Sequence, residues 1–78
     1  MFEYAKLRGR IKEVLRNEKE YANKMELTPQ AVSSKLNGNS YFTDKEIYKS
    51  CTILDIPMVE VPIYFFTLKT ELNSTNNN

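Results

Sequence analysis

The 78-residue sequence contains no histidine, no tryptophan and a single cysteine, Cys51. The absence of histidine removes the commonest metal ligand and the usual proton-transfer side chain near neutral pH. One cysteine without histidine can form neither a zinc finger nor a Cys–His nucleophile pair, and no intrachain disulfide is available. The sequence therefore predicts no metal site and no cofactor, and Cys51 is expected to pack as a small apolar side chain in a reducing cytoplasm.

Glycine and long apolar runs are also scarce. The only glycines, Gly9 and Gly38, exclude a glycine-rich phosphate-binding loop. No run of about 18 apolar residues is present, so no membrane span is expected. The segment 1–6 lacks the basic-then-apolar order of a secretion signal. A chain of this length forms one domain, in which the cleft that an active site needs is uncommon, so an enzyme is not expected.

Charge is unevenly distributed along the chain. Residues 1–40 contain eight Lys and Arg and five Glu, a net charge of +3. Residues 41–78 contain three Lys and five acidic residues, a net charge of −2. The first half is therefore the better candidate for contact with a polyanion.

Apolar residues at helical spacing predict a compact all-α domain of four to five helices. Asn17, followed by Glu20, has the pattern of an N-cap that begins a short second helix. The side chains expected to face inward from the first two helices are Tyr4, Leu7, Ile11, Val14, Leu15, Tyr21, Ala22 and Met25.

Thr28-Pro29 is the sharpest local signal in the sequence. Threonine is a favoured N-cap, and proline in the first helical position loses no hydrogen bond. A third helix is expected over about 29–36, with Val32 and Leu36 inward, and Gly38 ends it. So few residues separate the second and third helices that they must cross steeply, which predicts a helix-turn-helix over about 17–38.

Thr43-Asp44-Lys45-Glu46 predicts a capping box and a fourth helix, with Ile47, Cys51 and Leu54 inward. Pro57 ends that helix, and an extended stretch is expected over 58–61, between Pro57 and Pro62.

The end of the chain combines an apolar cluster with a polar tail. Ile63-Tyr64-Phe65-Phe66 points in every direction around a helical turn, so Tyr64, Phe65 and Phe66 are candidates for a partner or dimer interface. Residues 67–72 are expected to form a short extended arm that completes a domain over 1–72. Residues 73–78 are expected to be a disordered polar tail.

These residues together resemble the lambda-repressor and Cro-like helix-turn-helix family. The resemblance rests on Tyr21-Ala22, Met25, Leu27-Thr28, Val32-Ser33 and Leu36-Asn37-Gly38. With the flanking helices and the aromatic segment after the fourth helix, the chain also looks like the small regulators of phage lysis–lysogeny switches. The resemblance covers about residues 2–68 and implies a protein of the cytoplasm of a bacterial host.

The resemblance implies that the helix over 29–36 enters the DNA major groove with its N-terminal end against base edges. Carried over by position, the reading face begins at Pro29, and its base-reading residues are Gln30, Ser33 and Ser34. The residues expected to contact phosphate or sugar are Thr28, Lys35, Asn37, Asn39, Ser40, Tyr41, Arg10 and Arg16.

Two positions depart from the family pattern. Glu26 stands where the tight turn usually has glycine, and Glu18 stands where glutamine usually contacts a phosphate.

The sequence therefore leaves two functions open. The first is a sequence-specific transcriptional regulator that reads double-stranded operator DNA. Such a regulator could bind either as a monomer or as a homodimer. The alternative is a phage antirepressor or modulator that binds a repressor protein through the same helix-turn-helix.

Overall fold

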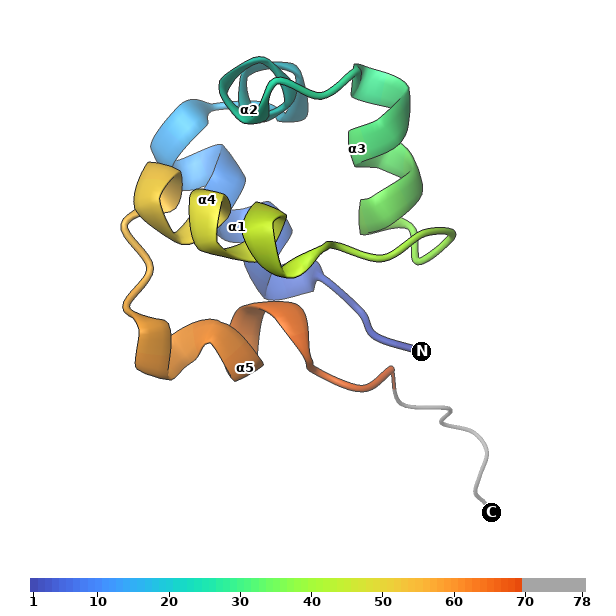
Figure 1. The fold of residues 1–78 in the computed structure, drawn as a ribbon, viewed down its shortest axis with the longest axis vertical. Helices are drawn as coiled ribbons and strands as arrows, with labels where there is room; N and C mark the ends of the chain where they lie inside the picture. Colours follow the sequence, from blue (N-terminus) through green and yellow to red (C-terminus); the bar gives the residue numbers. More distant parts are fainter. Residues whose placement is uncertain (70–78) are drawn as a thin grey trace.

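The computed structural model describes residues 1–69 and confirms the all-α fold. The elements are α1 (Ala5–Leu15), α2 (Glu18–Met25), α3 (Pro29–Leu36), α4 (Asp44–Leu54), the 3₁₀ helix η1 (Met58–Glu60) and α5 (Val61–Phe65). The helix α2 lies at one end of the long axis and α5 at the other, with α1 and α4 between them (Figure 1). The tail expected at 73–78 and the end of the expected arm lie outside the described residues.

Side-chain caps start three of the helices where the sequence predicts them. The Asn17 side chain accepts a hydrogen bond from the Glu20 amide at 2.8 Å, and Thr28 caps α3 in the same way. Thr43 and Glu46 form a reciprocal capping box, with donor–acceptor distances of 2.9 and 3.1 Å, at the start of α4. Each cap pairs an amide that the first helical turn leaves without a backbone partner.

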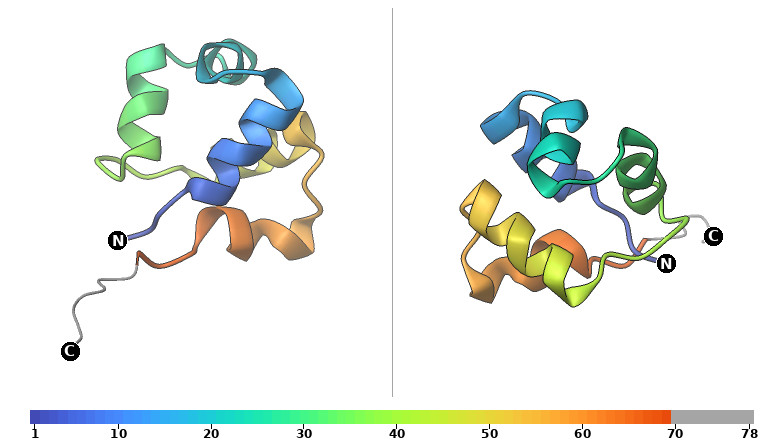
Figure 2. Two further views of the ribbon diagram at one scale, coloured as in Figure 1. Left: turned by 180° about the vertical axis from the view of Figure 1, so that it is seen from behind. Right: turned by 45° about the horizontal axis from the view of Figure 1, so that its top comes forward.

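The turn between α2 and α3 sets the geometry of the helix-turn-helix. Glu26 ends α2 in the left-handed conformation, with φ 62° and ψ 37°. Leu27 follows, and α3 begins after Thr28. Because the turn is so short, the two helices cross steeply: Figure 1 shows α2 almost end-on and α3 lengthwise, and Figure 2 gives two further views.

The core lies where the five helices meet. Its buried apolar residues are Tyr4, Leu7, Ile11, Tyr21, Ala22, Met25, Val32, Leu36, Cys51, Leu54, Ile56 and Phe65. The inward placement expected for Val14 is wrong, because its side chain is 39% exposed. Leu15, one helical turn after Ile11, packs against the core in its place.

The extended stretch expected over 58–61 is also wrong. Met58–Glu60 form η1 and continue directly into α5. Pro62 lies in the first turn of α5, where its missing N–H takes no hydrogen bond from the helix. The two prolines therefore flank a helical turn instead of an extended segment.

The described part of the C-terminal arm lies against the N-terminus. Phe2 and Leu68 form an isolated antiparallel bridge, and the Glu3 amide donates to the Thr67 carbonyl at 2.9 Å. The Phe2 and Phe66 rings meet edge to face, with 5.5 Å between their centroids. This contact closes the fold by joining its first and last described segments.

Candidate functional site

The outer side of α3 is the surface that the helix-turn-helix presents. Val32 and Leu36 hold the helix against the core, because both are buried. Pro29, Gln30 and Ser33 lie on the other side and are exposed. We call these three residues the α3 front. Two of the three base-reading residues expected from the sequence, Gln30 and Ser33, are therefore accessible.

Other predicted contacts on α3 are engaged within the fold. Ser34 is half-buried, and its hydroxyl lies 3.1 Å from that of Ser40. The Asn37 amide nitrogen donates to the Ser33 hydroxyl at 3.3 Å. The exposed Thr28 side chain is occupied by its capping bond to the Ala31 amide at 3.1 Å. These side chains make hydrogen bonds within the chain. The exposed residues of α3 left to contact a ligand are those of the α3 front.

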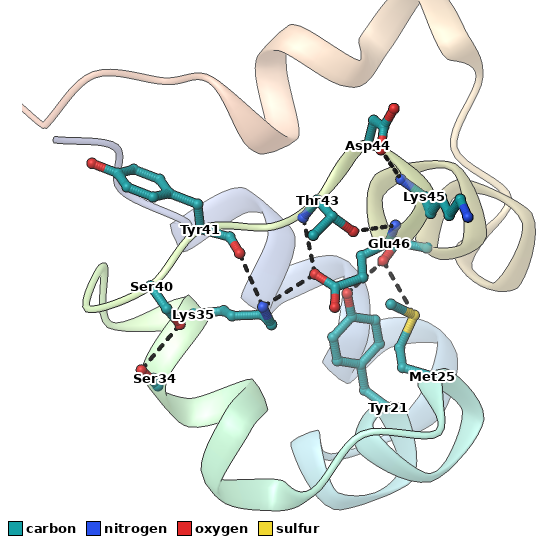
Figure 3. A network of polar contacts seen from close by, with 11 residues as sticks. Tyr21, Met25, Ser34, Lys35, Ser40, Tyr41, Thr43, Asp44, Lys45 and Glu46 are labelled. Carbon is teal, nitrogen blue, oxygen red and sulfur yellow. Dashed lines mark hydrogen bonds and ion pairs between the residues drawn. The ribbon is translucent and has the colours of Figure 1, made fainter.

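Lys35, expected to contact phosphate or sugar, is engaged within the fold. Its ammonium donates to the Tyr41 carbonyl at 2.9 Å and pairs with the Glu46 carboxylate at 3.1 Å (Figure 3). Only 13% of the side chain is exposed, and the ammonium lies 6.0 Å from the centre of the Phe42 ring. Lys35 therefore faces the loop before α4 and fastens it to α3, away from any ligand on the α3 front.

Arg10, expected to contact phosphate or sugar, is also engaged within the fold. Its guanidinium donates to the Leu54 carbonyl at 2.9 Å and to the Asp55 carbonyl at 3.0 Å. It also pairs with Glu13 at 3.2 Å. Arg10 thus satisfies carbonyls that the end of α4 leaves without helical partners. Arg16, at the end of α1, is exposed, and so are Asn39 and Tyr41 in the loop after α3.

Arg8 makes contacts around the helix-turn-helix that the sequence did not lead us to expect. Its guanidinium pairs with Glu18 at the start of α2 and donates to the Asn37 side chain at 2.7 Å. One side chain on α1 therefore ties the first residue of α2 to the residue that ends α3. Sequence alone gave no signal for this role, because Arg8 lies 29 positions from Asn37 and belongs to an ordinary basic helix face.

The two glutamates that depart from the pattern of the resemblance, Glu18 and Glu26, are both paired with cations of the chain. Glu18 is neutralised by Arg8, so it does not present a free anion. Glu26 pairs with Lys49 at 3.0 Å, and the same ammonium lies 3.4 Å from the Met25 carbonyl at the end of α2. Both glutamates are therefore paired with cations from other helices.

The α3 front carries no charge. Lys35 is the only charged residue in 28–37, and it is engaged as described above. Beside the front, α2 and α3 enclose a groove of about 360 Å³. Its lining residues are Lys19, Glu20, Ala22, Asn23, Leu27 and Pro29. The surface therefore combines apolar groups, neutral hydrogen-bonding groups and one charge of each sign.

The candidate partner residues of the C-terminal cluster are divided between core and surface. Phe65 is 1% exposed and meets Phe42 edge to face at 5.3 Å, so its expected place in an interface is corrected to the core. Tyr64 is half-buried against the core. Phe66 is 47% exposed and remains accessible to a partner.

The titratable groups with shifted pKa values belong to the core. Burial raises the pKa of Tyr21 to about 12, although its hydroxyl bonds that of Ser50. Burial likewise raises the pKa of the Cys51 thiol, which disfavours the reactive thiolate.

Among residues 1–69, no cluster of three or more His, Cys, Asp or Glu side chains is arranged to hold a metal ion. The described helices include none of the length and apolar character that crossing a membrane requires.

The chain matches one protein family and is similar to a solved structure. The model of the family described as "Protein of unknown function (DUF739)" matches residues 1–68. The chain is similar to the solution structure of the modulator of repression of the temperate bacteriophage TP901-1 from Lactococcus lactis, with 33% sequence identity and a TM-score of 0.76. That match covers 90% of this chain and 95% of the other. No curated protein matches the chain.

Proposed function

The chain belongs to the DUF739 family, and from that premise we propose that it is a phage regulator that modulates repression by binding a repressor protein. The similarity to the TP901-1 modulator of repression supports this function, because it extends over nearly the whole of both chains. In this proposal the partner docks on the α3 front and the adjoining groove. The chain acts by binding and catalyses no reaction.

The observation that carries the proposal is the uncharged α3 front. Affinity for DNA depends on lysine and arginine side chains that neutralise phosphates. Of the three cations expected to do this, Lys35 and Arg10 are held by groups of the protein itself, and Arg16, at the end of α1, is exposed. An uncharged surface beside a groove that combines apolar groups with one charge of each sign suits a protein partner better than it suits a polyanion.

Sedimentation velocity of the chain mixed with a repressor from the same phage tests the proposal. We expect one faster-sedimenting complex, and we expect the double variant Gln30→Ala/Ser33→Ala to bind the repressor about tenfold more weakly or worse. Thr52→Ala, at an exposed position on α4, is the matched control and is expected to bind normally. Absence of a complex with the unmodified chain overturns the proposal.

DNA reading is the second candidate function. It is favoured by the exposure of Gln30 near the N-terminal end of α3, because glutamine can bond both N6 and N7 of adenine. A gel-shift series with operator DNA alone discriminates between the two functions. DNA binding by this chain without a repressor, falling steeply as salt rises, supports the second candidate. Retardation of DNA only when the repressor is present supports the first.

A further inference from the structure

The outer side of the η1–α5 segment carries an exposed apolar stripe. Val59 is 83% exposed, and Ile63 and Phe66 are each 47% exposed. Val59 lies in η1, Ile63 in α5 and Phe66 directly after α5, at spacings of four and three residues that correspond to one face of a helix. We call these three residues the α5 stripe. Met58 and Leu68, which are 58% and 67% exposed, extend the apolar area at its two ends.

The opposite side of this segment is apolar as well. Phe65 is buried, and Val61 and Tyr64 pack against the core. A helix that is apolar on its outer side as well as its inner side is usually covered on both. Isolated apolar side chains on a surface are ordinary, but a contiguous row of this kind marks an interaction surface.

The charges beside the α5 stripe show which partner fits it. Between Pro57 and Leu68 the only charged side chain is Glu60, next to the start of the stripe, and Lys69 follows its end. No ion pair within the described chain engages either residue. When two such stripes lie antiparallel, Glu60 of each copy falls at the end where the other copy has Lys69.

We propose that a second copy of this chain covers the α5 stripe, with the two η1–α5 segments antiparallel about a two-fold axis. A two-fold contact requires a surface that complements itself, and an apolar row with opposite charges at its ends has that property. The stripe lies at the other end of the long axis from α2, so self-association leaves the groove beside α2 open (Figure 1). The inference goes beyond the proposed function and does not require a repressor.

Sedimentation equilibrium of the full chain tests this inference. The unmodified chain is expected to associate to a dimer, and Val59→Asp is expected to raise its dissociation constant about tenfold or more, because a carboxylate would be buried in an apolar contact. Val14→Asp is the matched control, because Val14 is an exposed valine of α1 outside the stripe, and it is expected to dimerise normally. Thermal unfolding followed by circular dichroism checks that both variants are folded.

A charge reversal tests the antiparallel arrangement separately. Glu60→Lys and Lys69→Glu, each made alone, place like charges together and are expected to weaken the dimer about threefold or more. The double variant Glu60→Lys/Lys69→Glu restores opposite charges and is expected to regain the dimer. Single variants that weaken the dimer without recovery in the double variant overturn the antiparallel arrangement.

Two further outcomes overturn the inference. The first is a chain that stays monomeric up to high micromolar concentration. The second is a Val59→Asp variant that loses repressor binding while self-association is unchanged, because the repressor would then be the occupant of the stripe. A failure of repressor binding in the unmodified chain leaves the dimer measurement intact, so the proposed function and this inference fail independently.

Discussion

At the scale of single residues, the buried pair of Tyr21 and Ser50 is the clearest determinant of stability. Both residues are fully buried, their hydroxyls are hydrogen-bonded, and the Ser50 hydroxyl also lies 3.4 Å from the Met25 sulfur. A hydroxyl buried without a partner loses its hydration and gains nothing in return. The pair therefore stabilises the junction of α2 and α4 only while both members are present.

Ser50→Ala is expected to lower the free energy of unfolding by about 1–3 kcal/mol, because it leaves the Tyr21 hydroxyl buried without a partner. Urea denaturation monitored by circular dichroism measures the change. Ser33→Ala, at an exposed serine, is the control and is expected to change stability by about 0.5 kcal/mol or less. The double variant Tyr21→Phe/Ser50→Ala removes both hydroxyls and is expected to be more stable than Ser50→Ala alone. Equal stability of the two serine variants contradicts this account.

The raised pKa of Tyr21 predicts a pH dependence of stability. The folded protein keeps the phenol protonated up to about pH 12, whereas an unfolded tyrosine releases its proton near pH 10. The unfolded state therefore binds fewer protons over this interval, and the free energy of unfolding falls as pH rises. The slope from this residue is at most about 1.4 kcal/mol per pH unit.

Urea denaturation at a series of pH values above about 9 checks this prediction. Tyr21→Phe is expected to show a shallower decline than the unmodified chain. Part of the decline is expected to remain, because burial also raises the pKa of Tyr4. An identical decline in the two proteins excludes Tyr21 as its source.

At the scale of elements, the turn between α2 and α3 holds a side chain in a strained conformation. Glu26 has φ 62°, which favours glycine, and its exposed ion pair with Lys49 returns little stability. Glu26→Gly is therefore expected to raise the free energy of unfolding by up to about 1 kcal/mol. Glu20→Gly, the same replacement inside α2, is expected to lower it by about 1 kcal/mol. Thermal unfolding of the two variants measures whether the free energy of unfolding rises or falls in each. A loss of stability in Glu26→Gly contradicts the conclusion that the turn strains Glu26.

Elements set by local chemistry could be predicted from the sequence. The caps at Asn17, Thr28 and Thr43 act on amides three residues ahead, so a short window of sequence contains the whole interaction. The steep crossing of α2 and α3 follows from a turn too short to permit another arrangement. The segment between Pro57 and Pro62 was predicted wrongly as extended, because prolines occur both beside extended segments and at the start of helical turns, and here they begin η1 and α5.

The roles of charged side chains could not be predicted, because their partners are far away in sequence. Arg10 bonds a carbonyl 44 residues away, and Arg8 bonds a side chain 29 residues away. Nothing in the local pattern separates either arginine from a solvated one on the same helix. The exposure of Gln30 and Ser33 followed from helical spacing once α3 was assigned, whereas the engagement of Lys35 depended on the loop that leads to α4.

At the scale of the whole molecule, the two proposed surfaces predict independent effects. The α3 front and the α5 stripe share no residues, and substitutions that lack common partners usually have additive effects. Gln30→Ala/Ser33→Ala is expected to weaken repressor binding and leave the dimer unchanged, and Val59→Asp is expected to do the reverse. Isothermal titration calorimetry with the repressor, alongside sedimentation equilibrium, measures the two constants for each variant. A change in both constants from either substitution alone contradicts separate surfaces.

The bridge between Phe2 and Leu68 also determines when a nascent chain can finish folding. The segment that pairs with the N-terminus is almost the last of the described residues to be synthesised, so Phe2 can pair with Leu68 only after all of the described helices have been translated. Phe65, the last buried core residue among the described residues, is synthesised only shortly before Leu68. Ribosome-bound intermediates that stop before this point therefore leave the side of the core that α5 covers open to solvent and to chaperones.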